Sequence, residues 1–179
     1  MVIERVKVGK TKMNCTIRNM IKSDIESLSH GFMNQGWPDR EEILARYFLE
    51  QKSKEREVLV AEIDGVVAGY ITSLPIAKQG PFAGMAPELS DFNVFEPFQN
   101  QGIGNLLMEE AENRVKLFSD KVTLGVGLHS GYGPAQRLYI KRGYIPDGTG
   151  VWYQNHQPAM NAVCEDIGEL VLYMSKNLF

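Results

Sequence analysis

Apolar residues recur along the chain with two periods, and each period predicts one kind of element. Spacings of three and four residues predict four amphipathic helices, at about 23–34, 39–52, 102–118 and 134–142. Runs rich in β-branched residues, or alternating apolar and polar positions, predict strands at about 14–19, 57–63, 66–74, 88–95, 122–128, 150–154 and 168–175. Because the helices interrupt the run of strands, the order predicts an α/β fold with a mixed sheet.

Short local signals mark the ends of several elements. Asp64-Gly65 between two apolar runs predicts a two-residue hairpin turn. Ser23 and Asp24 supply capping chemistry, and Glu26 follows Ser23 at capping-box spacing, so a helix is expected to begin there. Residues 75–87 contain three prolines and two glycines and predict a loop.

Length and composition narrow the class of protein. The 179 residues suit a single domain over 1–179, in which residues 1–13 are a loose N-terminal lead-in or an edge strand. A net charge of −3 argues against nucleic-acid binding, and the sequence has no apolar run long enough for a membrane span. Without a signal-peptide pattern, and with Cys15 and Cys164 far apart, we expect a cytoplasmic protein with neither a disulfide scaffold nor a metal site.

The segment Gln99–Asn105 (QNQGIGN) lies between a predicted strand and a strongly amphipathic helix. Its glycines allow close backbone approach, and the first N–H groups of a helix suit a phosphate or pyrophosphate. A plain glycine-rich helix entry is the alternative. Leu107 stands where a dinucleotide-binding fingerprint needs a small residue, so a dinucleotide ligand is disfavoured. Gly9-Lys10-Thr11 resembles the end of a P-loop motif. The motif's earlier glycine is missing, because Glu4 occupies that position, so we interpret the match as chance.

Two motifs carry a resemblance to a known family. Q-x-x-G-x-G at 99–104 resembles the acetyl-CoA pyrophosphate loop of the GNAT-type N-acetyltransferases. About 30 residues later, Ala135, Leu138-Tyr139 and Gly143-Tyr144 are similar to that superfamily's A-x-x-L-Y-x-x-x-G-[FY] segment. The order of elements also fits, with two helices between the first two strands, so the resemblance covers about residues 14–175.

The resemblance implies a fold, a cosubstrate and the residues that bind it. The fold is a mixed, mostly antiparallel sheet splayed between its fourth and fifth strands, here 88–95 and 122–128, with about four flanking helices. The cosubstrate is acetyl-CoA, with no metal. Its pantetheine arm maps to the backbone of Phe92, Asn93 and Val94. Its pyrophosphate maps to the backbone of the glycine loop, formed by Gln99, Asn100, Gln101, Gly102, Ile103, Gly104 and Asn105.

Tyr139 matches the family's common general acid, which protonates the departing CoA thiolate; a packing role is the alternative. Many relatives carry Asn, a pantetheine contact, at the position of Tyr132. That contact is lost here, replaced by the Tyr132 phenol, or made by backbone.

The residue that removes a proton from the acceptor amine is less well marked. Some relatives use a Glu early in the fourth strand, where Glu88 falls. Others use a Glu on the fifth strand, where this chain has Gly127. Asp91 is a second candidate, facing opposite Glu88 by strict alternation unless a bulge rotates it. For both carboxylates, capping a strand end or pairing with a cation is the alternative role. His129 is a weaker candidate base.

The acceptor pocket is expected to include Phe32, Trp37, Trp152 and Tyr153, with core packing as the alternative for each. The acceptor is a primary amine of a small molecule or peptide, and its identity is open. So are the use of another acyl-CoA and the oligomeric state, with a homodimer as one option. Two other functions remain: a non-catalytic CoA-binding regulatory module on the same fold, and a nucleotide-binding domain.

Overall fold

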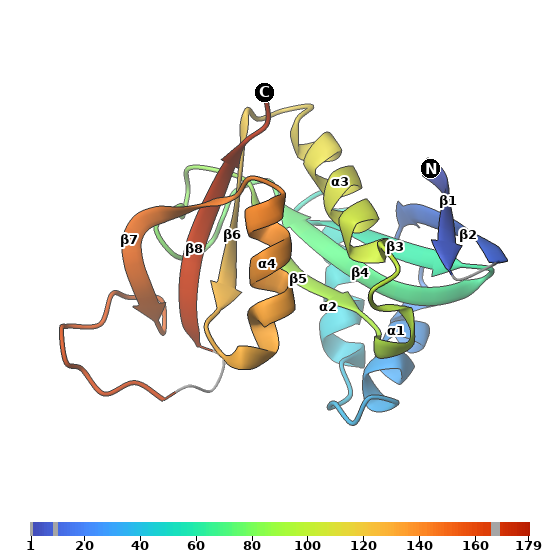
Figure 1. Ribbon diagram of the computed structural model, residues 1–179, viewed down its shortest axis with the longest axis horizontal. Coiled ribbons are helices and arrows are strands. Elements are labelled where there is room, and N and C mark those ends of the chain that lie inside the picture. Colours follow the sequence, from blue (N-terminus) through green and yellow to red (C-terminus); the bar gives the residue numbers. More distant parts are fainter. Residues whose placement is uncertain (1, 9–10, 166–168) are drawn as a thin grey trace. The chain divides into compact units, whose positions relative to one another are not determined.

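The computed structural model describes residues 2–8, 11–165 and 169–179, with side chains from residue 14 onward (Figure 1). Four α-helices and eight strands are present in these residues. In chain order they are β1 (Val2–Val8), β2 (Thr11–Asn19), α1 (Asp24–Met33), α2 (Glu41–Lys52), β3 (Glu57–Ile63), β4 (Val66–Leu74), β5 (Glu88–Val94), α3 (Ile103–Val115), β6 (Lys121–Gly127), α4 (Gly133–Lys141), β7 (Ile145–Tyr153) and β8 (Leu170–Asn177).

The strands hydrogen-bond in the order β1-β2-β3-β4-β5-β6-β8-β7. The β1–β2, β2–β3, β3–β4, β6–β8 and β7–β8 pairs are antiparallel. The β5–β6 pair is parallel, and its register joins Glu88 to Thr123 and Leu89 to Leu124. This mixed, mostly antiparallel sheet with four helices confirms the expected α/β fold class.

The chain divides into two compact units. The first comprises residues 1–74 and 91–114, and the second comprises 75–90 and 115–179. The division falls inside β5, between Ser90 and Asp91, so that the end of β5 belongs with β1–β4, α1, α2 and most of α3. The expected site residues therefore fall into two groups, one in each unit.

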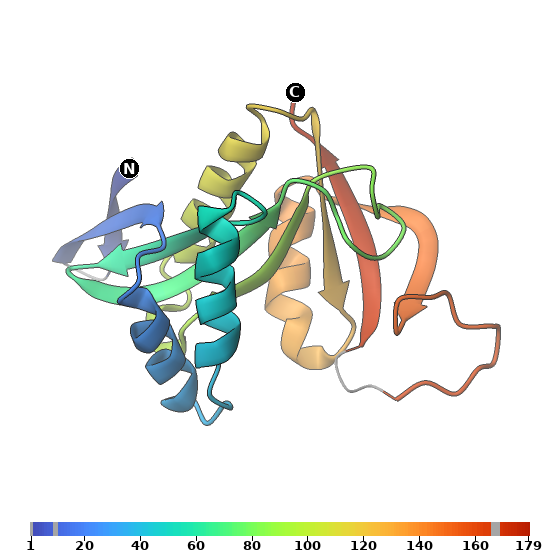
Figure 2. The ribbon, with the colours of Figure 1, turned by 180° about the vertical axis from the view of Figure 1, so that it is seen from behind.

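Helices α1 and α2 lie side by side in the first unit (Figure 2). Their apolar faces pack with residues of β3 and β4 into one buried cluster, which joins distant parts of the sequence. The cluster contains Met20, Leu28, Phe32, Leu44, Tyr47, Val58, Val60, Tyr70 and Phe95. None of the helices in the part of the chain that the structure describes has the length and apolar character needed to cross a membrane.

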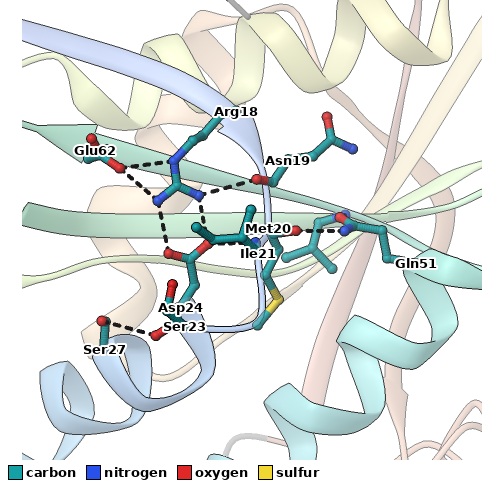
Figure 3. Close-up of polar contacts among 10 residues, drawn as sticks. Arg18, Asn19, Met20, Ile21, Ser23, Asp24, Ser27, Gln51 and Glu62 are labelled. Atoms are coloured by element: carbon teal, nitrogen blue, oxygen red, sulfur yellow. Dashed lines mark hydrogen bonds and ion pairs between the residues drawn. The ribbon is translucent and has the colours of Figure 1, made fainter. Parts of the chain in front are cut away.

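The N-terminus of α1 is tied to the sheet by Arg18 (Figure 3). The Arg18 guanidinium, on β2, donates to both carboxylate oxygens of Asp24, at 2.6 and 2.9 Å, and to Glu62 on β3 at 2.7 and 2.9 Å. Asp24 also accepts the Ile21 N–H at 2.8 Å. Hydrogen bonding with Asp24 is the largest cause that raises the pKa of Arg18. The expected capping box is wrong, because the Ser23 side chain makes no cap bond, and Asp24 anchors the helix instead.

We expect Asp24→Asn to lower the free energy of unfolding by about 2–4 kcal/mol, because it leaves the largely buried Arg18 side chain without its main counter-charge. The Asp24 side chain is 3% exposed, whereas that of Glu62 is 32% exposed. Glu62→Gln should therefore cost less than about 1 kcal/mol. Urea unfolding of both variants measures the difference, and equal losses would show that burial does not set the strength of these contacts.

Two strands begin several residues before their predicted starts. β2 begins at Thr11 rather than at 14, and Val2–Val8 forms the edge strand β1, one of the two readings of residues 1–13. β7 begins at Ile145 rather than near 150. Its register with β8 shifts between Pro146 and Val151, where Gly148 and Gly150 have positive φ, so this stretch lacks the alternation that marks a strand.

Candidate functional site

The first half of the glycine loop 99–105 is tied to the segment before it by the loop's own glutamine side chains. After β5 and a short 3₁₀ helix (Glu96–Phe98), Gln99 Nε2 donates to the Val94 carbonyl at 2.8 Å. Gln101 Nε2 donates to the Pro97 carbonyl, also at 2.8 Å. The backbone is left-handed at Asn100 (φ 59°) and at Gly102 (φ 87°). These bonds fix the loop as it leads into α3.

The start of α3 offers N–H groups to an anion. Leu106 N–H donates to the Gly102 carbonyl at 3.2 Å, so the N–H groups of Ile103 and Gly104 come before the first helical hydrogen bond. A Cβ added at Gly102 would meet nothing within 4 Å, so the space beside it is open. Open space next to a helix N-terminus leaves room for a pyrophosphate.

Two buried acceptors in the same unit lack partners, and one of them, on Asn93, supports the fit to CoA. Asn93 Oδ1 and Gln101 Oε1 are buried and have no hydrogen-bond partner among the residues described. Buried polar atoms are normally satisfied, so exceptions need an explanation. Gln101 lies in the loop expected to bind the pyrophosphate, which has no N–H to donate. Asn93 lies in the segment expected to bind the pantetheine arm, which carries amide N–H donors. The residues present therefore fit this cosubstrate.

Asp91 breaks the alternation of β5. Its φ is 44°, in the left-handed region that non-glycine residues rarely adopt. The expectation that Asp91 faces opposite Glu88 rested on strict alternation, and that alternation does not continue through residue 91. Asp91 is thus a local irregularity of β5, the exception under which its side chain need not face opposite Glu88.

The Asp91 carboxylate forms a bidentate ion pair with Arg40. Arg40 Nη1 reaches Oδ1 at 3.0 Å and Nη2 reaches Oδ2 at 2.6 Å, while Nη1 also donates to the Tyr70 hydroxyl at 3.1 Å. Burial, and then the charge of Asp91, raises the pKa of Tyr47 to about 12, and the same two causes raise the pKa of Tyr70. Both phenols therefore stay protonated at neutral pH. The Asp91 carboxylate therefore belongs to a polar cluster with Arg40, Tyr47 and Tyr70.

The two aromatic residues expected in the acceptor pocket of this unit lie in different environments. Phe32 is 3% exposed and packs edge-on against Tyr70 and Phe95 in the core. The Arg40 guanidinium lies over its ring, 4.8 Å from the centroid. Trp37, in the turn between α1 and α2, is 61% exposed. Phe32 thus packs in the core, while Trp37 presents its indole to solvent.

In the second unit, Tyr139 is buried on α4. Its ring lies 5.9 Å from that of Tyr144, and its own exposed fraction is 7%. Burial raises the pKa of Tyr139, because a phenolate is costly away from water. The hydroxyl therefore keeps its proton at neutral pH and is a weaker proton donor than a solvent-exposed phenol.

Tyr132 lies against Gly127. A Cβ added at Gly127 would overlap the Tyr132 ring, at 2.9 Å from Cζ. The Tyr132 ring thus fills the space that a side chain at position 127 would occupy. The two departures from the family pattern, Tyr132 in place of Asn and Gly127 in place of Glu, therefore lie against each other. His129 Nδ1 accepts the Gly131 N–H at 3.1 Å, so the candidate base His129 caps the short 3₁₀ helix Ser130–Tyr132.

Glu88 and Trp152 both lie near Tyr173 of β8. Burial, followed by the charge of Glu88, raises the pKa of Tyr173. The Trp152 ring packs edge-on against that of Tyr173 at 5.7 Å, and its Nε1 donates to Thr149 Oγ1 at 2.7 Å. Tyr153, one residue further, contacts the His156 ring. No local pattern marks Tyr173 as a site residue, because its neighbours are distant along the chain.

Comparisons with known proteins find one matching family model and several similar folds. The model of the acetyltransferase (GNAT) family matches residues 22–144. An N-acetyltransferase from Staphylococcus aureus Mu50 has a similar structure, with a TM-score of 0.69 and 17% identity over 93% of this chain and 99% of its own. The ribosomal-protein-S18-alanine N-acetyltransferase of Escherichia coli has a TM-score of 0.66 and 16% identity, over 92% and 94% of the two chains.

A Salmonella typhimurium protein solved with its cofactor acetyl-CoA is also similar, with a TM-score of 0.65 and 22% identity over 92% of this chain and 94% of that one. At such identities these structures establish a common fold. No curated protein matches the sequence.

Proposed function

Because this chain belongs to the GNAT acetyltransferase family, we propose that it moves the acetyl group of acetyl-CoA to a primary amine by direct attack in a ternary complex. The observation that carries the proposal is the glycine loop leading into α3, with open space beside Gly102 and the N–H groups of Ile103 and Gly104 ahead of the first helical bond. This arrangement suits a ligand with a pyrophosphate.

In the proposed reaction the amine nitrogen forms a bond to the acetyl carbon, and the carbon–sulfur bond breaks. The electron pair of that bond stays on sulfur, which takes a proton from the Tyr139 hydroxyl. The amine loses one proton to a base. The backbone of Phe92–Val94 holds the pantetheine arm, and an N–H of β5 polarises the thioester carbonyl. No acyl-enzyme is required.

Glu88 is the carboxylate we propose as the base, directly or through water. An amine with a pKa of about 10 is neutral in only about one part in 10³ at pH 7. Glu88→Gln should therefore lower kcat/KM by about 10²-fold at neutral pH. The loss should shrink as pH rises, because the neutral amine becomes more abundant.

Asp147→Asn is the matched control, since the charge of Asp147 also contributes to the raised pKa of Tyr173. That variant should keep wild-type activity, as measured by kcat/KM between pH 6 and 10. A wild-type pH profile for Glu88→Gln would exclude Glu88 as the base.

The acceptor is proposed to be a primary amine on a small molecule or a peptide. Similar structures include enzymes named for a ribosomal-protein alanine and for spermidine, so the fold serves both kinds. A screen of peptides, polyamines, aminoglycosides and amino acids with acetyl-CoA tests the proposal, with release of free thiol as readout. The expected result is turnover on at least one amine.

A CoA-binding module without activity is the second candidate. It is favoured by Gly127, which leaves one family position without an acid, and by the engagement of Asp91 with Arg40. Calorimetry that detects CoA binding, combined with no turnover on any amine, would establish this candidate and reject the enzyme.

A further inference from the structure

We infer that the Arg40–Asp91 ion pair is a positioning device for Phe92–Val94, the β5 segment that receives the pantetheine arm if the proposed function is correct. Asp91 is left-handed, a conformation that persists in a strand when its surroundings hold it. The bidentate bonds from Arg40, at 2.6 and 3.0 Å, are such a restraint. The restrained residue, Asp91, directly precedes Phe92, the first residue of the segment Phe92–Val94.

Arg40 is itself fixed from several directions. Its backbone N–H donates to Ser29 Oγ at 3.1 Å, and its carbonyl accepts the first helical bond of α2 from Leu44 at 3.0 Å. Its guanidinium also lies over the buried ring of Phe32 and donates to the Tyr70 hydroxyl. The start of α2 thus presents a rigid fork to Asp91.

The other end of the segment is fixed by β4. A Cβ added at Gly69 would overlap the Asn93 carbonyl and lie 2.9 Å from Val94 Cα, so the two backbones approach closely there. Phe95 N–H donates to the Ala68 carbonyl at 2.9 Å. Between the two fixed ends lies Asn93, whose buried Oδ1 has no partner in the portion of the chain that is described. The segment Phe92–Val94 is therefore held at both ends, and Asn93 Oδ1 is left as an acceptor for a ligand.

This inference gives Asp91 a role other than proton transfer. Both oxygens of its carboxylate accept from Arg40, and hydrogen bonding to Asp91 is among the causes that raise the pKa of Tyr47 and of Tyr70. A carboxylate engaged in this way is poorly placed to accept a proton from an amine. Asp91 and Arg40 are positioning residues.

Two ligands distinguish an effect on the pantetheine-binding segment from a general loss of protein stability. CoA uses both the glycine loop and β5, whereas 3′-phospho-ADP is the part of CoA that lacks the pantetheine arm. We expect Asp91→Ala, which removes the carboxylate and disfavours positive φ, to weaken CoA binding at least tenfold by calorimetry. Binding of 3′-phospho-ADP should stay within twofold of wild type.

Milder variants separate the ion pair from the backbone conformation. Asn tolerates the left-handed region, so Asp91→Asn weakens the pair with Arg40 without disfavouring the backbone conformation. Asp91→Asn and Arg40→Gln should each weaken CoA about fivefold, and the double variant should be no worse than either one, because both changes break the same pair. Arg40→Lys, which keeps the charge without the fork, serves if a harsher variant fails to fold. Asp24→Asn, which breaks an ion pair at the other end of α1, should leave both affinities unchanged.

Equal losses for the two ligands, or no loss of CoA binding in folded variants, would overturn the inference while leaving the proposed function intact. Wild-type protein that binds neither CoA nor 3′-phospho-ADP would instead overturn the proposed function, and the inference with it.

Discussion

Tyr139→Phe is expected to lower kcat by 10- to 10³-fold, or about 1.4 to 4 kcal/mol of activation free energy, with little change in the KM for acetyl-CoA. The Tyr139 hydroxyl is proposed to protonate the sulfur, and negative charge reaches sulfur only as the carbon–sulfur bond breaks. Its loss is therefore felt in the transition state rather than in cosubstrate binding. Phenylalanine keeps the ring and its packing against Tyr144, so the melting temperature should change little.

Tyr144→Phe is the matched control. Tyr144 is 1% exposed and lies beside Tyr139, but the family motif accepts Phe or Tyr at this position. Steady-state kinetics with saturating amine should give wild-type kcat for this variant. A loss equal to that of Tyr139→Phe would mean that removing any buried hydroxyl from this unit disturbs activity.

Tyr132, another phenol of the same unit at the start of α4, is a candidate to replace Tyr139. If it does, the double Phe variant will lose more activity than the sum of the two single losses predicts. Full activity in both the single and the double variant would mean that the thiolate leaves without a proton donor. Tyr139 would then be a packing residue.

The features that the sequence predicted well are local ones. The Asp64-Gly65 hairpin forms with positive φ at both residues, as its turn type requires. The glycine loop and the start of α3 were also found from neighbouring residues, because φ preference and helix capping act over a few positions. The four helices follow from periodicity over ten or more residues, which averages out local exceptions.

The contacts that the sequence could not predict join distant residues. Arg40 and Asp91 are 51 positions apart, and Arg18 and Glu62 are 44 apart. A charged residue carries no local sign of its partner, so Asp91 read from sequence was equally a base or half of an ion pair. The fit of Tyr132 onto Gly127 was hidden for the same reason, since it depends on how the chain turns after β6.

Gly104→Val is expected to weaken CoA binding at least tenfold, or by about 1.4 kcal/mol, because a branched side chain on the second residue of α3 covers the N–H groups proposed to hold the pyrophosphate. Valine is at least as good a helix residue as glycine, so the fold should be retained. Asn113→Val places the same side chain at an exposed position of α3 and should leave the affinity unchanged.

The same variant has a second expected result that distinguishes it from Asp91→Ala. Because the pyrophosphate is present in both CoA and 3′-phospho-ADP, Gly104→Val should weaken the two ligands by the same factor in calorimetry. Asp91→Ala should weaken CoA alone. If a folded Gly104→Val protein binds both ligands with wild-type affinity, the start of α3 does not hold the pyrophosphate. If it loses CoA but keeps 3′-phospho-ADP, the helix N-terminus contacts the pantetheine arm instead, and the order of the ligand along β5 and α3 must be reversed.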